Sequence, residues 1–272
     1  MTDAADRFDG LAEAYEMHRP GYPAAAFHAL LPDLRCAARV AVDIGAGPGN
    51  STASLRGALG PDWRYIAIEP GRDMRRVLSR RFSTAADLHI ADATAEDMKL
   101  PAGFAAIVLA CTAFHWFDAC RFYTEAGRVL APGGVLALIR NRRKPQAVLQ
   151  AFDRYIERHS SETPDLALRE TRKEPPVRDL GQVPGFMAPR SCTYGWSNEV
   201  SARGLIDLYL TRSTLWGVVR RIGLSRVMAD LTAITAEVCL PDAPIRIDWE
   251  TTAKWARRRA DVGARMPGSP QT

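Results

Sequence analysis

The sequence has little of what membrane proteins and disulfide-rich proteins need. No apolar run reaches the length of about 18 residues that a membrane-spanning helix requires. The five cysteines are scattered and none forms a CxxC pair, which argues against a disulfide framework or a zinc ribbon. The first ten residues, MTDAADRFDG, are acidic and polar, unlike a secretory signal. We therefore expect a cytoplasmic protein with no membrane segment.

Metal-ligating residues are also sparse. Cys111, His115 and Cys120 lie close together in the sequence and are conceivable ligands. A structural zinc needs four ligands at short spacings, and no second cluster supplies the others. We expect no metal.

The positive charge is concentrated near the C-terminus. The formal net charge is +5 and the pI is about 9.1. Residues 254–265 contain five basic residues and one acidic residue, a net +4, which leaves +1 for the rest of the chain. A second basic run, RNRRK at 140–144, is interpreted as a solvated loop after a strand. Aromatic residues do not alternate with these basic runs as in single-strand-binding platforms, so we do not expect a nucleic-acid partner.

Apolar runs alternate with helical stretches between residues 39 and 140, a pattern that predicts parallel βαβ units. Strands are expected at 38–45, 64–69, 87–91, 104–111 and 134–140. Helices are expected at 50–59, 71–82 and 118–130. Two later strands, 191–197 and 245–252, would extend the edge of the sheet. The expected fold is α/β: a Rossmann-like, doubly wound, seven-stranded and mostly parallel sheet with an inserted, mainly helical cap.

A glycine-rich loop follows the first expected strand in VAVDIGAGPGNST, residues 40–52. Gly45, Gly47 and Gly49 allow a sharp turn and a close approach of the backbone to a ligand. The dinucleotide fingerprint GxGxxG would need glycine at position 50, where this chain has Asn50, and a Walker loop would need Gly-Lys-Ser/Thr. A tight strand-to-helix turn without a ligand is the alternative.

Six motifs in order identify the family that the sequence resembles. They are YEMHRPGYP (15–23), VDIGAGPGNST (42–52), AIEPGRDM (67–74), ATAEDMKLP (93–101), AFHWFD (113–118) and VLAPGGVLAL (129–138). Together they resemble class I S-adenosylmethionine-dependent methyltransferases, and within them the small-molecule branch that includes trans-aconitate methyltransferases. The resemblance covers about residues 10–140. The family usually starts its fourth strand with Phe-Asp, whereas this chain has Phe104 and Ala105.

The resemblance implies S-adenosylmethionine as the cofactor and a set of residues that bind it. These residues are Tyr15, Arg19, Gly45, Ala46, Gly47, Gly49, Glu69, Pro70, Met74, Thr94, Ala95, Cys111 and Thr112. The carboxylate of Glu69 would accept hydrogen bonds from the ribose hydroxyls. Asp92 competes with the loop at Thr94 to Glu96 for the adenine edge. Arg19 would pair with the carboxylate of the cofactor or with a substrate acid, unless it is only a surface arginine.

The substrate pocket is expected beyond the fourth strand, with His115, Trp116 and Tyr22 in its wall. His115 is the candidate general base, with a role restricted to lining the pocket as the alternative. A carboxylate acceptor would need no base. The expected activity is methyl transfer to a small organic molecule, with an oxygen acceptor (carboxylate or hydroxyl) favoured. N- or C-methylation, an RNA methyltransferase and a non-catalytic cofactor-binding protein are the alternatives.

Four parts of the chain are expected. Residues 1–144 would form the cofactor-binding core with an N-terminal helical cover, and 145–240 a mainly helical cap that contains the strand at 191–197. Residues 241–256 would supply the last strand of the core, and 257–272 a basic, flexible tail. The partner is a small-molecule methyl acceptor, and the sequence leaves the oligomeric state open.

Overall fold

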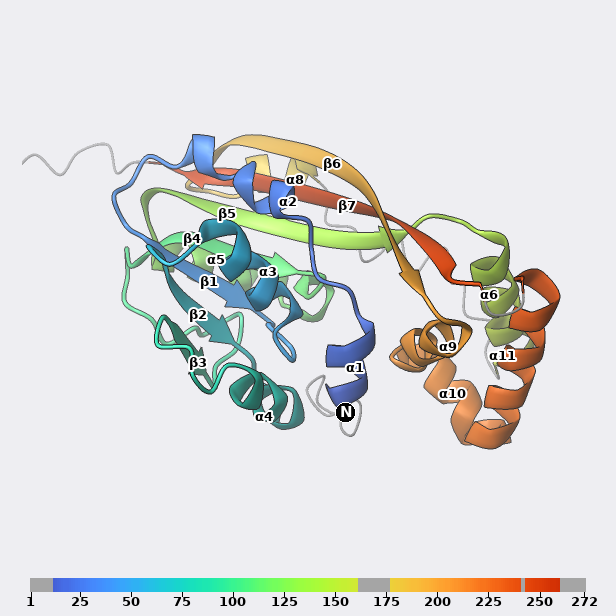
Figure 1. Cartoon of the computed structure of the whole chain (residues 1–272). Coiled ribbons are helices and arrows are strands. Elements are labelled where there is room, and N and C mark those ends of the chain that lie inside the picture. The colour runs from blue at the N-terminus through green and yellow to red at the C-terminus, as the bar shows by residue number, and fades with distance from the viewer. Residues whose placement is uncertain (1–11, 161–176, 241–242, 260–272) are drawn as a thin grey trace, which may run out of the picture.

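The chain forms a seven-stranded sheet in the order β3-β2-β1-β4-β5-β7-β6 (Figure 1). The computed structural model describes residues 12–160, 177–240 and 243–259. The strands are β1 (Val40–Ile44), β2 (Arg64–Ile68), β3 (Leu88–Ala91), β4 (Ala105–Cys111), β5 (Leu130–Arg143), β6 (Phe186–Val200) and β7 (Ile245–Arg258). The first five strands pair in parallel, whereas β7 runs antiparallel to both β5 and β6. The predicted fold class is confirmed.

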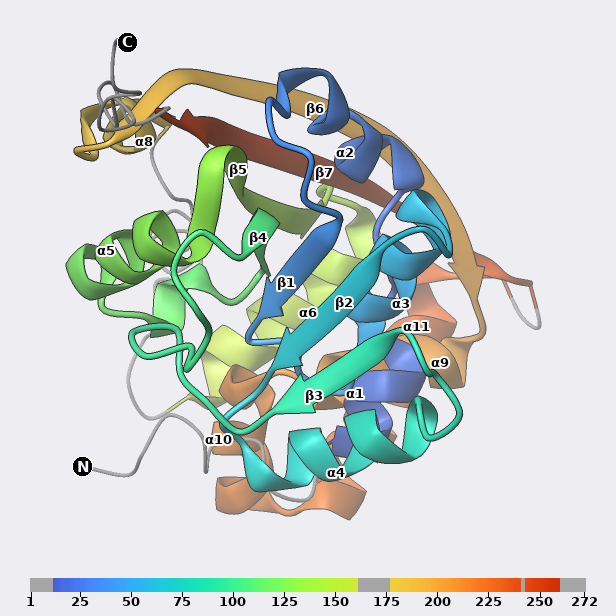
Figure 2. The same cartoon turned by 90° about the vertical axis from the view of Figure 1, so that its left-hand side faces the viewer.

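Helices cover both faces of the sheet (Figure 2). The helices in the described part of the chain are α1 (Ala12–His18), α2 (Ala24–His28), α3 (Asn50–Leu59), α4 (Arg72–Arg81), α5 (Ala119–Val129), α6 (Ala147–His159), α8 (Val177–Gln182), α9 (Ala202–Leu210), α10 (Ser213–Ile222) and α11 (Leu224–Val238), with 3-10 turns η2 (Leu31–Asp33) and η3 (Phe114–Trp116). Phe27 of α2 and Leu55 of α3 pack on one face with Leu109. Phe122 and Val129 of α5 pack on the other face.

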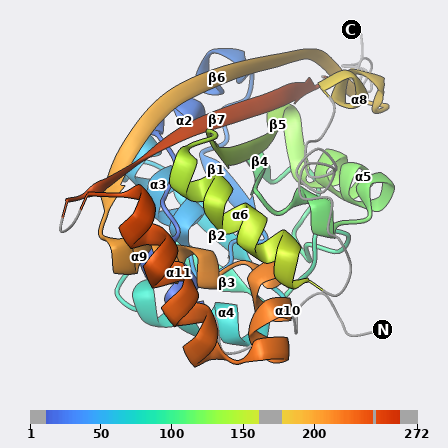
Figure 3. The same cartoon turned by 90° about the vertical axis from the view of Figure 1, so that its right-hand side faces the viewer.

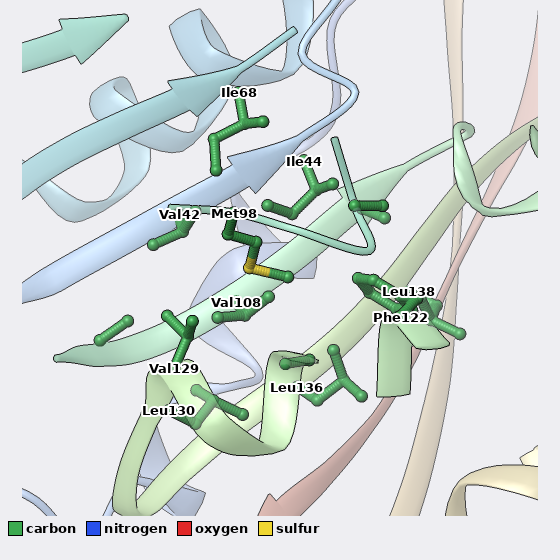
Figure 4. Close-up of a cluster of buried hydrophobic side chains, with 14 of the residues drawn as sticks. Val42, Ile44, Ile68, Met98, Val108, Phe122, Val129, Leu130, Leu136 and Leu138 are labelled. Carbon is green, nitrogen blue, oxygen red and sulfur yellow. The ribbon is translucent and has the colours of Figure 1, made fainter. Parts of the chain in front are cut away.

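The core on the α5 side explains why the central strands are so apolar (Figure 4). All seven residues of β4, AAIVLAC, are buried, because helices cover the strand on both faces. Val108 packs there with Met98 and Phe122. This rigid centre fixes the ends of β1, β2 and β4, where the candidate site lies.

The helices α6, α9, α10 and α11 form a separate layer, here called the helical cap, beyond the ends of β5, β6 and β7 (Figure 3). Its core contains Phe152, Tyr209 and Leu231, and Trp249 of β7 packs against them. The cap therefore has a hydrophobic core of its own that is anchored to the sheet through β7.

The late strands are longer than expected. The sequence predicts a strand at 191–197, but β6 spans 15 residues from Phe186 to Val200. Likewise β5 continues to Arg143, so residues 140–143 lie in a strand and the solvated-loop interpretation was wrong. Strand β7 ends at Arg258, two residues inside the range expected to be a tail. Residues 260–272 of that tail, and residues 1–11 of the N-terminal cover, lie outside the described part of the chain.

Across the described residues, no helix is long and apolar enough to cross a membrane. In the same residues, no group of three or more His, Cys, Asp or Glu side chains is arranged to hold a metal ion.

Candidate active site

The loop between β1 and α3 places three glycines in the left-handed region, with φ of +64° at Gly45, +56° at Gly47 and +96° at Gly49. A Cβ at Gly45 would lie 2.7 Å from that of Ala113, and one at Gly49 would lie 2.5 Å from the ring of Phe82. A Cβ at Gly47 would meet no atom within 4 Å. Gly45 and Gly49 are thus required by packing, whereas Gly47 faces open space and leaves the backbone accessible to a ligand.

Glu69 lies at the end of β2, and its carboxylate is held by backbone groups on two sides. Oε2 accepts a hydrogen bond from the N–H of Gly47, and Oε1 accepts one from the N–H of Gly71, each at 2.8 Å. Burial raises the pKa of Glu69, while these two hydrogen bonds and Arg75 act in the opposite direction. Each oxygen keeps a second lone pair, so the fixed carboxylate suits a ligand with two neighbouring hydroxyls.

Asp43, one residue before the end of β1, is buried beneath the loop. Its Oδ2 accepts hydrogen bonds from the hydroxyls of Ser51 and Thr52, both at 2.7 Å. Its Oδ1 is buried and has no hydrogen-bond partner among the described residues. Burial raises the pKa of Asp43 to about 6 in spite of the two hydroxyls, and the charge of Glu69 adds to the rise. An unsatisfied buried oxygen favours a ligand that donates hydrogen bonds or carries positive charge.

Two cavities open at the carboxyl ends of the strands. The larger has a volume of about 290 Å³ and is lined by residues that include Glu69, Met74 and Trp116. The smaller, of about 60 Å³, includes Arg19, Tyr22 and Trp249 in its wall. They share the residues Tyr15, Gly45, Gly47, Cys111 and Thr112. Because they share this wall, the two cavities adjoin along the glycine loop and the end of β4.

Most of the predicted site residues line these cavities. Those in the larger cavity alone are Glu69, Pro70, Met74, Thr94, Ala95 and Trp116. Those in the smaller cavity alone are Arg19, Tyr22 and Ala46. Gly49 lines neither, because it faces Phe82 and Leu78. Asp92 also lines neither and pairs with Arg75 at 2.7 Å, whereas Glu96 of the alternative loop lines the larger cavity.

His115 does not line either cavity in the described structure. It lies in the 3-10 turn η3, and its ring centroid is 4.8 Å from that of Trp116, which does line the larger cavity. The general-base role therefore stays a prediction, because Trp116 and not its neighbour His115 lines the larger cavity.

Two residues that line the smaller cavity come from β5 and β7 and were missed in the sequence. Asn141 donates from Nδ2 to the carbonyl of Gly21 at 2.8 Å and accepts from the Thr251 hydroxyl at 2.6 Å. Trp249 donates from its indole nitrogen to Asn198 at 2.6 Å. Asn141 lies in the basic run 140–144, which was interpreted from the sequence as a solvated loop. The position of Trp249 depends on the pairing of β7 with β5, for which the sequence carried no local signal.

Tyr22 completes the floor of the smaller cavity. Its hydroxyl and that of Thr112 are hydrogen-bonded at 2.9 Å. Burial raises the pKa of Tyr22 well above its ordinary value, so the phenol is protonated at neutral pH. It therefore supplies a neutral hydroxyl and not a base.

The N-terminal segment connects the core with the helical cap. Glu13 and Glu16 of α1 pair with Arg76 and Arg80 of α4 at 2.6 and 3.0 Å. Farther along, the guanidinium of Arg19 lies 5.0 Å from the centroid of the Tyr15 ring, and its Nε donates to the hydroxyl of Thr211 at 2.7 Å. Tyr15 is thereby held at the wall that the two cavities share, and Arg19 at the wall of the smaller cavity.

Comparisons with known proteins agree with this geometry. A family model described as a methyltransferase domain matches residues 42–138. An uncharacterised methyltransferase of Mycobacterium tuberculosis is 32% identical over 213 residues, which are 78% of each chain. The structure of a putative type II methyltransferase from Anaeromyxobacter dehalogenans has a TM-score of 0.66 and 25% identity, covering 89% of this chain and 99% of that one.

A more distant structure shares the fold. It is a phosphoethanolamine N-methyltransferase 2 of Haemonchus contortus, solved with phosphomonomethylethanolamine and S-adenosylhomocysteine. Its TM-score is 0.50 at 14% identity, and the match covers 94% of this chain and 60% of that one.

Proposed function

This chain belongs to the class I S-adenosylmethionine-dependent methyltransferases, and we propose that it transfers the methyl group to an oxygen atom of a small organic molecule. The cofactor supplies an electrophilic methyl group on a sulfonium. The residues of the chain have to bind it, exclude water and hold the acceptor in line. Such positioning contributes about 7–11 kcal/mol of the barrier reduction in well-oriented reactions.

The cavity residues fit S-adenosylmethionine. Glu69 offers two fixed oxygens to a ribose, with Met74 and Pro70 as apolar surface beside it in the larger cavity. The buried carboxylate of Asp43 lies beneath the loop that the two cavities share and lines neither of them, so its negative charge would favour the ammonium group of the cofactor through the loop and not by direct contact. Arg19 suits the carboxylate, since a guanidinium binds carboxylates through two hydrogen bonds. We assign the adenosine to the larger cavity, the amino-acid end to the wall that the two cavities share, and the acceptor to the smaller cavity beyond that wall.

One observation carries the proposal of an oxygen acceptor. Among the described residues that line the smaller cavity, none is a histidine, an aspartate or a glutamate. Tyr22 keeps its proton, as its raised pKa requires, and burial also raises the pKa of the Cys111 thiol well above its ordinary value. The cavity thus favours an acceptor that is nucleophilic without a base, and a carboxylate is the most common such group at neutral pH.

His115 has a role in this scheme only for a different acceptor. A hydroxyl acceptor near Trp116 would need a base, and the His115 ring lies beside that of Trp116, with the two centroids 4.8 Å apart. A carboxylate in the smaller cavity would leave His115 out of the chemistry. We therefore propose the carboxylate as acceptor and keep His115 as the base for a hydroxyl substrate.

The basic residues at the end of β5 favour a small molecule over RNA as the methyl acceptor. Arg140 is buried, Arg142 pairs with Glu250 at 2.7 Å, and Arg143 is partly buried under the helical cap. They do not form the exposed basic surface that binds phosphate backbones.

The proposal is tested by calorimetry with S-adenosylmethionine, followed by methyl-transfer assays on carboxylic acids and on the amides of the same acids. We expect micromolar cofactor binding and transfer to acids only. Failure to bind the cofactor would refute the assignment of the cavities. Transfer to the amides with no transfer to the acids would refute the carboxylate acceptor.

A further inference from the structure

Arg143, the last residue of β5, lies beside the smaller cavity on the side of the helical cap. It faces the same side of the strand as Asn141, two residues earlier, because side chains alternate along a strand. It is also the direct partner of Trp249 in the β5–β7 pairing. Asn141 and Trp249 both line the smaller cavity. Arg143 itself lines neither cavity, but through these two neighbours it stands next to the wall of the smaller one, at the border between the sheet and the cap.

The surroundings of Arg143 are aromatic and cationic. Its guanidinium carbon lies 4.5 Å from the centroid of the Tyr209 ring, and that of Arg212 lies 5.0 Å from the same ring. Tyr209 is fully buried in the core of the cap. Burial lowers the pKa of Arg143 to about 10, with Arg212 and Arg19 adding to the decrease and Tyr209 and Asp153 opposing it. The side chain is still charged at neutral pH.

The neighbouring arginines have partners in the protein. Arg212 binds the carboxylate of Asp153 at 2.6 Å, and Arg142 on the opposite face of β5 binds that of Glu250 at 2.7 Å. Among the described residues, Arg143 has no hydrogen-bond acceptor and no carboxylate in ion-pair distance. A partly buried guanidinium with five donors is costly unless something accepts from it.

We propose that Arg143 binds an anionic group, a carboxylate or a phosphate, on the methyl acceptor. This inference rests on the proposed function, since it assigns the acceptor to the smaller cavity. The guanidinium fork matches either anion through two parallel hydrogen bonds, and the Tyr209 ring holds the fork in place from the cap. Arg19 would bind the carboxylate of the cofactor, and Arg143 would bind the anionic group of the acceptor. The acceptor is a small acid with one oxygen near the sulfonium and a second anionic group under the cap.

A purely structural role, in which Arg143 only attaches the cap through Tyr209, makes a different prediction. In that case removal of the guanidinium would lower the thermal stability, and no anion would depend on it. Binding of anions therefore separates the two roles, while thermal unfolding alone does not.

The experiment uses the full chain saturated with S-adenosylhomocysteine. Glutarate, inorganic phosphate and the uncharged glutaramide are titrated separately by calorimetry in a buffer without other multivalent anions. The comparison of glutarate with phosphate distinguishes an organic acid from a phosphate ester as the source of the anionic group. The variants are Arg143→Gln and Arg143→Lys, and Arg142→Gln is the matched control from the same strand.

We expect glutarate or phosphate to bind the wild type and the Arg142→Gln control equally. Affinity should fall about tenfold or more in Arg143→Gln and partly recover in Arg143→Lys. The affinity for S-adenosylhomocysteine should not change, and glutaramide should not bind. If Arg143→Gln does not fold, Arg143→Lys tests the proposal instead. The loss of the forked guanidinium should still weaken the binding of glutarate or phosphate several-fold.

The proposal is overturned if neither anion binds the wild type, or if the anion affinity of the folded variant equals that of the wild type. Methyl transfer to a neutral small acceptor with an unchanged KM in Arg143→Gln would overturn it too, and would leave the methyltransferase assignment intact. Loss of cofactor binding in the wild type would instead refute the proposed function.

Discussion

Oε2 of Glu69 accepts a hydrogen bond from the backbone N–H of Gly47 at 2.8 Å. The contact joins the end of β2 to the glycine loop after β1, two segments that meet only because the strands are parallel neighbours. The same carboxylate also accepts from Gly71, so its orientation is fixed before any ligand arrives. Preorganisation of this kind lowers the entropic cost of binding.

Glu69→Gln should weaken cofactor binding about 10- to 100-fold, because the amide replaces a charged acceptor of the ribose hydroxyls and of the Gly47 and Gly71 amides. Calorimetry with S-adenosylhomocysteine measures the change. Glu250→Gln, which removes a carboxylate from the surface pair with Arg142, is the control and should bind normally. Equal affinities in the two variants would remove Glu69 from the cofactor site.

Substitution by alanine should impair folding at Gly49 and cofactor binding at Gly47. Gly49→Ala places a Cβ 2.5 Å from Phe82 at a φ of +96°, so we expect the protein to be destabilised by several kcal/mol or to fail to fold. Gly47→Ala meets no atom, and its left-handed φ should cost about 1–2 kcal/mol. The methyl group of Gly47→Ala should enter the ligand space and abolish cofactor binding in a folded protein. Thermal unfolding and calorimetry together check this, and normal binding by Gly47→Ala would contradict it.

The raised pKa of Asp43 should make the free energy of unfolding depend on pH. Its pKa is raised from 3.8 to about 6, so the folded chain without cofactor binds a proton that the unfolded chain releases. This contribution is fully present below pH 3.8 and is lost as the pH rises through about 6. The total change is about 3 kcal/mol at 1.36 kcal/mol per pKa unit.

Asp43→Asn should remove this component. Denaturant unfolding of the cofactor-free protein between pH 4 and 7, compared with the wild type, provides the measurement. Saturation with S-adenosylmethionine should flatten the wild-type curve, because a cationic partner stabilises the ionised carboxylate. The idea is lost if the wild type and Asp43→Asn show parallel pH profiles.

His115 and Trp116 should differ in their effect on turnover. His115→Ala should leave kcat within about threefold if a carboxylate is the acceptor, since no proton has to be removed. Trp116→Ala should raise the KM of the cofactor or the acceptor, because this ring lines the larger cavity. Steady-state kinetics with a carboxylic acid acceptor tests both variants. A loss of kcat of about 100-fold in His115→Ala, relieved at high pH, would establish it as the base.

The sequence predicted the parts of the site that depend on local order along the chain. Gly45, Gly47 and Glu69 lie at the ends of consecutive parallel strands, and the βαβ order brings such ends together. Asn141, Trp249 and Arg143 could not be found in this way. Their meeting depends on the register of β5 with β7, which pairs Arg143 with Trp249 across 106 positions of sequence.

His115 illustrates a different limit. Its place after β4 was predicted, but the direction of its ring depends on the 3-10 turn η3 and on the tilted contact with the ring of Trp116. A single turn decides which of two adjacent side chains lines a cavity, and apolar periodicity contains no such information. The role of Tyr209 could not be predicted from the sequence either. Its ring lies in the core of the helical cap and at the same time contacts the guanidinium groups of Arg143 and Arg212.

The most direct test of methyl transfer to a small acid is the fate of a labelled methyl group. The enzyme would be incubated with S-adenosylmethionine labelled in the methyl group and a panel of small di- and tricarboxylic acids, and the products treated with mild alkali. A carboxylate acceptor yields a methyl ester, so we predict label in the small-molecule fraction that alkali releases as methanol. Label that is stable to alkali, label in added RNA, or no transfer from a bound cofactor would contradict the account.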